Sequence, residues 1–298
     1  MAFLDRVRQL PWLGLGVSTE YGAGDQPGAL NLLALRRQFP QFAGFLEVGV
    51  ETSKGLDTHA QGWAATGGRT TYHFLDLNLD EAEDFDEHWL GELRGILAEL
   101  QPAWICGDAG LWHAGNRDRG QLLLLPPVLT DASATAFAEG IVRLRVATGL
   151  EVLPENPPGV AFVGDLSLLE FYARVCERAD TGMLLDCAHL AIYQAATGRS
   201  ALDGLADFPM ERVVEIHVAG AVQRRQGGYS WLEDEHGINV LPETWRIAET
   251  VLQSAPNVRA AVFECERNLL PAVLPGFSRL EKLILATESV RRAATVNG

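Results

Sequence analysis

Lysine is almost absent from this chain, and so is any excess of positive charge. Only Lys54 and Lys282 are lysines among 298 residues, and 39 acidic residues outnumber 24 basic ones, which gives a formal net charge of −15. A surface of this sign repels phosphate backbones and anionic lipids. We therefore expect neither nucleic acid nor a membrane as a partner.

The chain also lacks the marks of a disulfide-rich or exported protein. Its four cysteines form no Cys-x-x-Cys pair, and Cys106, Cys187 and Cys265 lie in apolar runs where a thiol packs as a small hydrophobic group. No apolar run reaches the roughly 18 residues of a membrane span, and the N-terminal segment has no signal-peptide pattern. We expect a soluble, cytoplasmic protein.

What the sequence does contain is an alternation of apolar runs and helical segments. The runs are near-continuous, as in strands covered on both faces, and occupy residues 13–18, 44–50, 70–75, 103–108, 150–156, 182–189, 213–220 and 260–266. Helical spacing is clearest at 86–101, 131–149, 165–179, 242–255 and 278–294. Eight strands alternating with helices predict an α/β fold, a xylose-isomerase-like (β/α)8 TIM barrel, with residues 1–298 as one domain.

Acidic and imidazole side chains recur where these predicted strands end. The carboxyl ends of barrel strands share one rim, so residues far apart in the sequence should converge on one cavity. Crowded carboxylates raise one another's pKa unless cations compensate their charge. Asp and Glu oxygens with His nitrogens, and no cysteine among the candidate ligands, suit Mn, Fe or Zn. We predict a metal site with the ligands Glu155, Asp186, His189, Glu215, His217, Asp234, His236 and Glu264.

Spacing adds detail to this prediction. Glu215 and His217 are two residues apart in a strand, so they point the same way. Asp186 and His189 can meet one ion only if the strand turns at once into a helix or loop. Asp108 also ends a predicted strand. The sequence is equally compatible with Asp108 as a metal ligand and with Asp108 as a helix cap or ion-pair partner.

The polar, glycine-containing segment 221–243 is longer than a connection needs, and we interpret it as a long βα loop over the site. Arg224 and Arg225 in this loop could bind a substrate carboxylate through charge-assisted hydrogen bonds. The competing interpretation is that both arginines are solvated.

Several motifs occur in a characteristic order: LPENPPG (153–159), LLDCAHLAIY (184–193), EIHVAG (215–220), DEHGINVLPETW (234–245) and FECERNLLP (263–271). This ordered set resembles the multinuclear non-haem iron-dependent oxidases, the barrel enzymes that include the methanobactin-biosynthesis oxidase. The upstream segments YHFLDLNL (72–79) and GLGVSTEYG (14–22) extend the resemblance over most of the chain.

The resemblance implies two or three bound iron ions (Fe2+/Fe3+) and dioxygen as cosubstrate. It implies oxidation of a Cys, Asn or Asp side chain in a ribosomally made peptide (RiPP biosynthesis), usually with a partner protein that grips the leader peptide. Glu155 resembles the family's central bridging carboxylate and His73 matches the histidine of its LHG motif. We expect these two residues, with Asn156, to act in catalysis.

Four departures from the family pattern bear on the number of metals. Gly49, Ala109 and Ala221 replace family histidines, and Thr52 replaces an asparagine. Unless Asp108 or His113 substitutes, one iron position loses a ligand. The hypothesis is therefore a dinuclear centre rather than a trinuclear one.

Two other functions remain open from the sequence. A two-metal sugar isomerase, epimerase or hydrolase on the same barrel would use the same carboxylates without dioxygen, but such sites often use a lysine, and neither lysine is expected at a strand end. The third alternative is a non-catalytic relative that lost ligands and serves as a scaffold.

Overall fold

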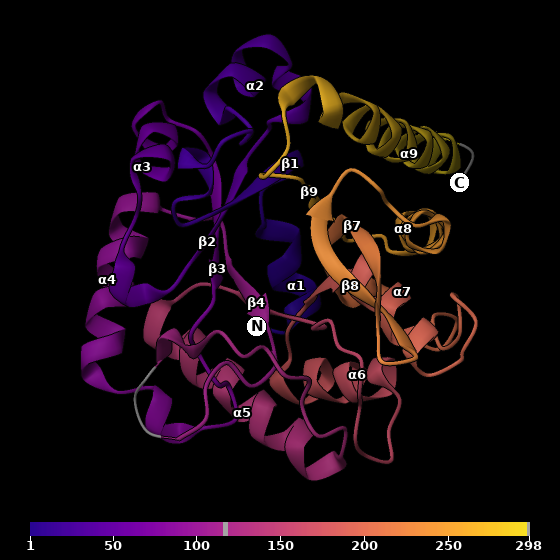
Figure 1. Ribbon diagram of the computed structural model, residues 1–298. Coiled ribbons are helices and arrows are strands. Elements are labelled where there is room, and N and C mark those ends of the chain that lie inside the picture. The colour runs from indigo at the N-terminus through magenta and orange to yellow at the C-terminus, as the bar shows by residue number, and fades with distance from the viewer. Residues whose placement is uncertain (116–118, 297–298) are drawn as a thin grey trace.

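A computed structural model describes residues 1–115 and 119–296, and its centre is a closed barrel (Figure 1). Parallel strands neighbour one another in the order β6-β5-β4-β3-β2-β1-β9-β7, and β6 pairs with β7 to close the ring. The predicted TIM barrel is thereby confirmed. The strands are β1 (Gly14–Glu20), β2 (Leu46–Val50), β3 (Thr70–Phe74), β4 (Ile105–Asp108), β5 (Val152–Glu155), β6 (Met183–Asp186), β7 (Val213–Gln226) and β9 (Ala260–Glu264).

Helices surround the barrel, and local signals set several of their ends. Asp86 caps α4, Ser167 and Glu170 form the capping box of α6, and Gly149 ends α5 with a left-handed φ of 74°. The helices are α1 (Phe3–Arg6), α2 (Leu32–Gln38), α3 (Thr58–Ala65), α4 (Glu87–Leu100), α5 (Asp131–Thr148), α6 (Leu168–Ala179), α7 (Cys187–Ala196), α8 (Pro242–Ser254) and α9 (Leu270–Val296). Among the described residues, no helix is both long and apolar enough to cross a bilayer.

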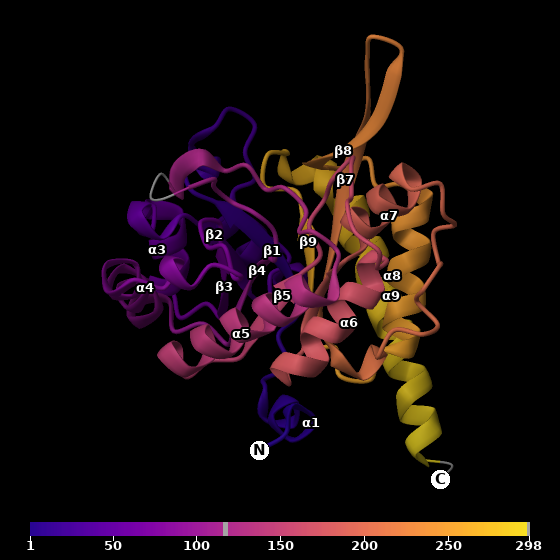
Figure 2. The same cartoon turned by 90° about the horizontal axis from the view of Figure 1, so that it is seen from below.

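The two ends of the barrel differ in polarity. At the amino end, Phe3 and Val7 of the N-terminal segment pack with Trp104 and other interior side chains into a dry apolar cluster. Figure 2 shows α1 at this end, opposite the projecting strands β7 and β8. The apolar plug leaves the carboxyl end as the place where the barrel interior can hold polar side chains.

The segment 221–243 is not a loop, which corrects the sequence interpretation. Strand β7 continues to Gln226, turns at Gly227 and Gly228 with φ of 56° and 85°, and returns as the antiparallel strand β8 (Tyr229–Gly237). This hairpin extends well beyond the barrel (Figure 2). The exposed strands of the hairpin have the polar composition of a loop, which explains the wrong interpretation. The Gly227–Gly228 pair was the available signal for a hairpin turn.

Two helix boundaries also differ from the prediction. The strand expected at 182–189 ends at Asp186, and α7 begins at Cys187 because Asp186 caps the helix. Helix α9 begins at Leu270, before the expected start at 278, and contains Pro275. Apolar residues continue across both boundaries, so hydrophobic periodicity alone did not mark them.

Candidate metal centre

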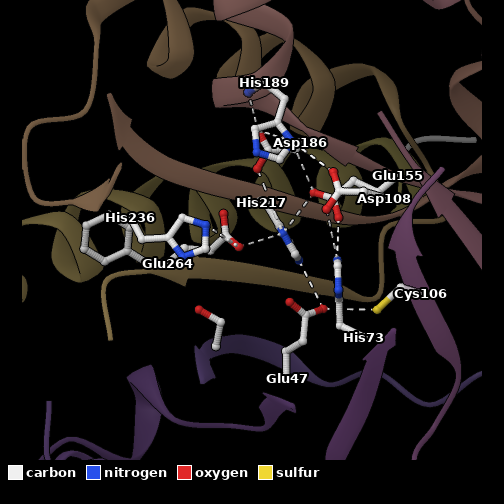
Figure 3. Close-up of polar contacts among 12 residues, drawn as sticks. Glu47, His73, Cys106, Asp108, Glu155, Asp186, His189, His217, His236 and Glu264 are labelled. Carbon is white, nitrogen blue, oxygen red and sulfur yellow. Dashed lines mark hydrogen bonds and ion pairs between the residues drawn. The ribbon is translucent and has the colours of Figure 1, made fainter. Parts of the chain in front are cut away.

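A cavity of about 360 Å³ opens at the carboxyl ends of the barrel strands. Side chains from β1, β2, β3, β4, β5, α7, β8 and β9 line it. Figure 3 shows how these side chains point toward one another. The titratable groups that line it and lie close together are Glu47, His73, Asp108, Glu155, His189, Asp234, His236 and Glu264.

Glu155 lies at the centre of the cluster. Its Oε2 atom is 2.7 Å from Nε2 of His73, and Asp108 Oδ2 is 3.9 Å from the same nitrogen. Burial disfavours the charged imidazole, but the hydrogen bond to Glu155 and the charge of Glu47 outweigh burial and raise the pKa of His73 to about 9. These contacts support His73 and Glu155 as one functional unit.

Asp186 and His189 meet on the first turn of α7, which is the geometry their spacing required. Asp186 accepts a hydrogen bond from the backbone N–H of His189, and Glu155 Oε1 is 3.6 Å from His189 Nδ1. The side chain of Asn156 exchanges two 3.0 Å hydrogen bonds with the backbone of Asp186. Asn156 is fully buried, and these two bonds hold the backbone of Asp186 in place, whereas the catalytic role of Asn156 stays a prediction.

His217 connects the central carboxylate to the β9 side of the cavity. Its Nδ1 atom lies 3.3 Å from Oε1 of Glu155 and 3.3 Å from Oε1 of Glu264. Its Nε2 atom lies 3.2 Å from Glu47 Oε2. Sequence reasoning missed Glu47, although an acid in the middle of the apolar run 44–50 was the available signal.

Asp234 and His236 come from the base of the hairpin. The register shifts from Gly220 paired with Gly237 to Ala221 paired with Asp234, and His236 takes a left-handed φ of 48° within this bulge. Its Nε2 atom lies 3.1 Å from Asp234 Oδ2 and its Nδ1 atom 2.7 Å from Glu266 Oε1. The bulge thus turns two predicted ligands into the cavity.

Glu215 lies apart from the other predicted ligands. It sits deeper in the barrel, where its Oε2 atom accepts a 2.6 Å hydrogen bond from Trp104 Nε1, and it does not line the cavity. Burial and the charge of Glu47 raise the pKa of Glu215 to about 8. Glu47, Cys106 and Glu215 form a close group that is joined through Glu47 to the group of His217 and Glu264, so Cys106 packs against acids as well as apolar residues.

The structure does not bring Arg224 and Arg225 to the cavity. Both are exposed on the hairpin, and Arg224 Nε pairs with Glu233 Oε2 at 2.7 Å. The cationic side chains that do line the cavity are Lys54, which pairs with Glu51, and Arg267, which pairs with Glu20. Neither lysine sits at a strand end, as expected, but the side chain of Lys54 reaches the cavity from the turn Thr52–Lys54 that follows β2.

His113 does not replace the missing family histidine. Its Nε2 atom is 2.8 Å from Asp84 Oδ2, outside the set of side chains that line the cavity. Asp108, in contrast, lies in a group with His73 and Glu155 whose ligand atoms are all within 4.8 Å of one another. Of the two proposed substitutes, only Asp108 faces the cavity.

The donor set suits divalent transition metals, because it combines carboxylate oxygens with imidazole nitrogens. Burial raises the pKa of Asp186 to about 7, and the charges of Glu264 and Glu155 add to that effect. A cation between these groups would remove the repulsion. Among the described residues, the following buried atoms, which line the cavity or lie directly behind its lining, have no hydrogen-bond partner: Asp108 Oδ1, Glu155 Oε1, Asp186 Oδ2, His189 Nε2, His217 Nδ1, Asp234 Oδ1 and Glu264 Oε2.

Sequence comparison relates the chain to known proteins. Residues 30–281 match the family described as RiPP precursor modification enzyme MbnB/TglH/ChrH. A UPF0276 protein of Anaeromyxobacter is 30% identical over 60% of this chain, and one of Bordetella pertussis is 28% identical over 86%. The aligned part spans 62% of the Anaeromyxobacter protein and 89% of the Bordetella protein.

Structural comparison finds the same barrel in proteins of very low identity. A xylose isomerase-like TIM barrel protein from Mycobacterium smegmatis, solved with magnesium, has a TM-score of 0.59 at 9% identity and covers 94% of this chain and 98% of its own. A xylose isomerase domain protein from Planctomyces limnophilus has a TM-score of 0.52 at 14% identity and covers 95% and 97%. At these identities the likeness shows the fold alone.

Proposed function

Since the chain belongs to the RiPP precursor modification enzymes of the MbnB/TglH/ChrH family, we propose that it is an iron-dependent oxidase that uses dioxygen to modify a side chain of a ribosomally made peptide. The observation that carries this proposal is the set of buried, unpartnered carboxylate and imidazole atoms that converge on one cavity. Burying such atoms without a partner is energetically unfavourable. Bound cations would supply the missing partner.

We propose two iron ions that share Glu155. One ion would lie with Glu155, Asp186 and His189, and the other on the hairpin and β9 side of Glu155. The group of Glu155 with His73 and Asp108 marks the third position, which lacks the family histidine. His217, Asp234, His236 and Glu264 would complete the ligand set on the hairpin and β9 side. Bound iron would supply redox chemistry with dioxygen and a charge that holds the substrate heteroatom.

The other cavity residues would bind and orient the peptide side chain, a Cys, Asn or Asp. Trp112, Leu122, Leu124 and Pro158 form apolar walls that exclude water. Lys54 and Arg267 provide positive charge at the mouth, in place of Arg224 and Arg225, for a peptide carboxylate. A partner protein that grips the leader peptide is part of the same proposal.

Anaerobic reconstitution tests the metal centre. After loading with Fe2+ and desalting, we expect about two iron ions per chain, the composition of two-metal sites. Less than one iron per chain would contradict the proposal, and a third equivalent would make the group of His73, Asp108 and Glu155 a site of its own.

Oxygen uptake tests the reaction. The iron-loaded chain, incubated in air with candidate precursor peptides taken from neighbouring reading frames, should consume dioxygen and change the mass of one peptide, whereas the magnesium-loaded chain should do neither. Conversion of the peptide without dioxygen would exclude the oxidase.

One observation favours a second candidate, a two-metal isomerase or epimerase. Lys54 reaches the cavity mouth, where it could polarise a sugar carbonyl. This candidate predicts sugar turnover with Mn2+ or Mg2+ under anaerobic conditions, and Lys54→Met should abolish that turnover. The same substitution would only weaken peptide binding in an oxidase.

A further inference from the structure

Two histidines of the cluster, His217 and His236, use one ring nitrogen for a carboxylate behind them and leave the other facing the shared cluster. Figure 3 shows this arrangement for His217 and Glu47. In His217, Nε2 lies 3.2 Å from Glu47 Oε2, while Nδ1 has no hydrogen-bond partner and faces Glu155 and Glu264. In His236 the roles are reversed, because Nδ1 lies 2.7 Å from Glu266 Oε1 and Nε2 faces Asp234.

His189 provides an internal comparison for this arrangement. Its Nδ1 atom lies 2.9 Å from the backbone carbonyl oxygen of Asn156. A carbonyl oxygen can only accept, so Nδ1 carries the hydrogen and the lone pair of the neutral ring is on Nε2. An ionised carboxylate is likewise only an acceptor, and the same reasoning therefore applies to His217 and His236.

Glu47 and Glu266 are held rigidly enough to fix these rings. Glu47 Oε2 also accepts from the thiol of Cys106 at 3.1 Å, and Glu266 Oε2 accepts from the hydroxyl of Ser18 at 3.2 Å. Both carboxylates are 2% exposed. Neither can turn toward solvent without giving up these bonds.

We propose that Glu47 and Glu266 are positioning residues that select the metal-binding nitrogen of each ring, Nδ1 in His217 and Nε2 in His236. The inference rests on the proposed metal centre and adds to it two residues and the ligand atoms. A carboxylate that accepts the far N–H fixes the tautomer and ring orientation and makes the free nitrogen more basic.

Zinc provides a diamagnetic probe for this proposal. The full-length chain with 15N-labelled histidine is loaded with Zn2+, and long-range 1H–15N spectra report which ring nitrogen bears hydrogen. We expect hydrogen on Nε2 of His217 and on Nδ1 of His189 and His236. Metal on Nε2 of His217 or on Nδ1 of His236 would overturn the assignment.

Conservative variants test whether the two carboxylates matter. Glu47→Gln and Glu266→Gln keep the side-chain volume, and each should weaken Zn2+ binding by about 10- to 100-fold, the usual effect of losing such a partner. Glu51→Gln is the matched control, since Glu51 is also buried beside the cavity but pairs with Lys54 rather than with a histidine. Its affinity should change by much less.

The outcomes separate this inference from the proposed function. If the unmodified chain retains no zinc, iron or cobalt, the metal centre itself fails and this inference fails with it. If the metal binds but both Glu→Gln variants match Glu51→Gln in affinity, only the positioning role is lost. Thermal unfolding of each metal-free variant identifies any loss of binding that comes from misfolding.

Discussion

Glu155 is the residue on which the cavity depends most. It contacts His73 directly and lies within 3.6 Å of His189 and 3.3 Å of His217. Burial raises its pKa, but the nearby charges of His217 and His73 and the hydrogen bond with His73 outweigh burial, so the pKa of Glu155 is lowered far below its ordinary value. The carboxylate is therefore ionised and available to a cation at any physiological pH.

Glu155→Ala should abolish metal retention, because it removes the carboxylate shared by two ligand groups. Metal analysis after desalting should fall from about two ions per chain to near none, as expected when a two-metal site loses its bridge. Glu249→Ala removes an equal charge from the exposed face of α8 and should retain the metal. Equal metal content in both variants would contradict the metal centre and favour the alternative of a non-catalytic scaffold protein.

Gly49→His tests the account of the missing family ligand. A Cβ at Gly49 would meet nothing nearer than Thr19 O at 3.4 Å, and Gly49 pairs in register with His73. The new imidazole would join His73 and Asp108, so iron content should rise by about one ion per chain, since three protein ligands suffice for a catalytic ion.

Gly49→Leu provides the matched control, because it adds a side chain of comparable size without a donor atom. A similar metal content in both Gly49 variants would mean that the lost histidine does not limit the number of ions.

Some of the site could be predicted from residue positions alone. Glu155, Asp186 and Glu264 end strands, and strand ends of a barrel share a rim, so their convergence followed from the fold. Glu47 and Glu266 were not in the predicted ligand set, because their importance depends on which ring nitrogen they contact. Glu215 was predicted as a ligand from alternation, which gives the direction of a side chain but not its depth in the barrel.

At the scale of elements, the β7–β8 hairpin is the least expected feature. Two of the candidate ligands, Asp234 and His236, belong to its second strand rather than to the barrel. Their direction depends on the bulge next to Gly220, where the backbone of β8 comes very close. A Cβ at Gly220 would lie 2.4 Å from the carbonyl oxygen of Gly237.

Gly220→Ala should therefore displace the base of β8 and weaken metal binding. The backbone has to shift to accommodate the methyl group, and we expect a loss of stability of about 1–3 kcal/mol, typical of overpacking. Isothermal titration with Zn2+ and thermal unfolding measure the two effects. Unchanged affinity would show that the bulge does not position Asp234 and His236.

Gly91→Ala is the opposite case and controls for the added methyl group. Gly91 is exposed in the middle of α4, and a Cβ there meets nothing within 4 Å. This substitution should stabilise the chain by about 0.5–1 kcal/mol, because alanine loses less entropy than glycine in a helix. Metal affinity should stay the same.

At the scale of the whole molecule, the barrel interior changes from mainly apolar at one end to mainly charged at the other, and Glu215 bonded to Trp104 lies between the two. The apolar cluster around Phe3 and Trp104 fills one end, and the carboxylates and imidazoles fill the other. The near-continuous apolar runs were sufficient to predict this fold, because each strand is covered on both faces. The hairpin was not predictable in the same way, since its composition follows solvent exposure.

Metal binding should stabilise the whole chain. An ion that binds the folded state and not the unfolded one adds about 2.7 kcal/mol at a free concentration of 100 times its Kd. For a protein of this size that corresponds to a rise in Tm of about 5 °C. Calorimetry with Zn2+ and with a chelator measures the difference, and identical Tm values in both conditions would contradict a metal centre in the barrel.

The arm formed by β7 and β8 has a mechanical consequence. One of its strands is continuous with a barrel strand, and the other carries Asp234 and His236 at its root. The solvent-exposed tip is therefore connected to the cavity by two hydrogen-bonded strands, with the bulge beside Gly220 as an irregularity in their pairing. A molecule that binds the tip therefore binds the same element that carries Asp234 and His236.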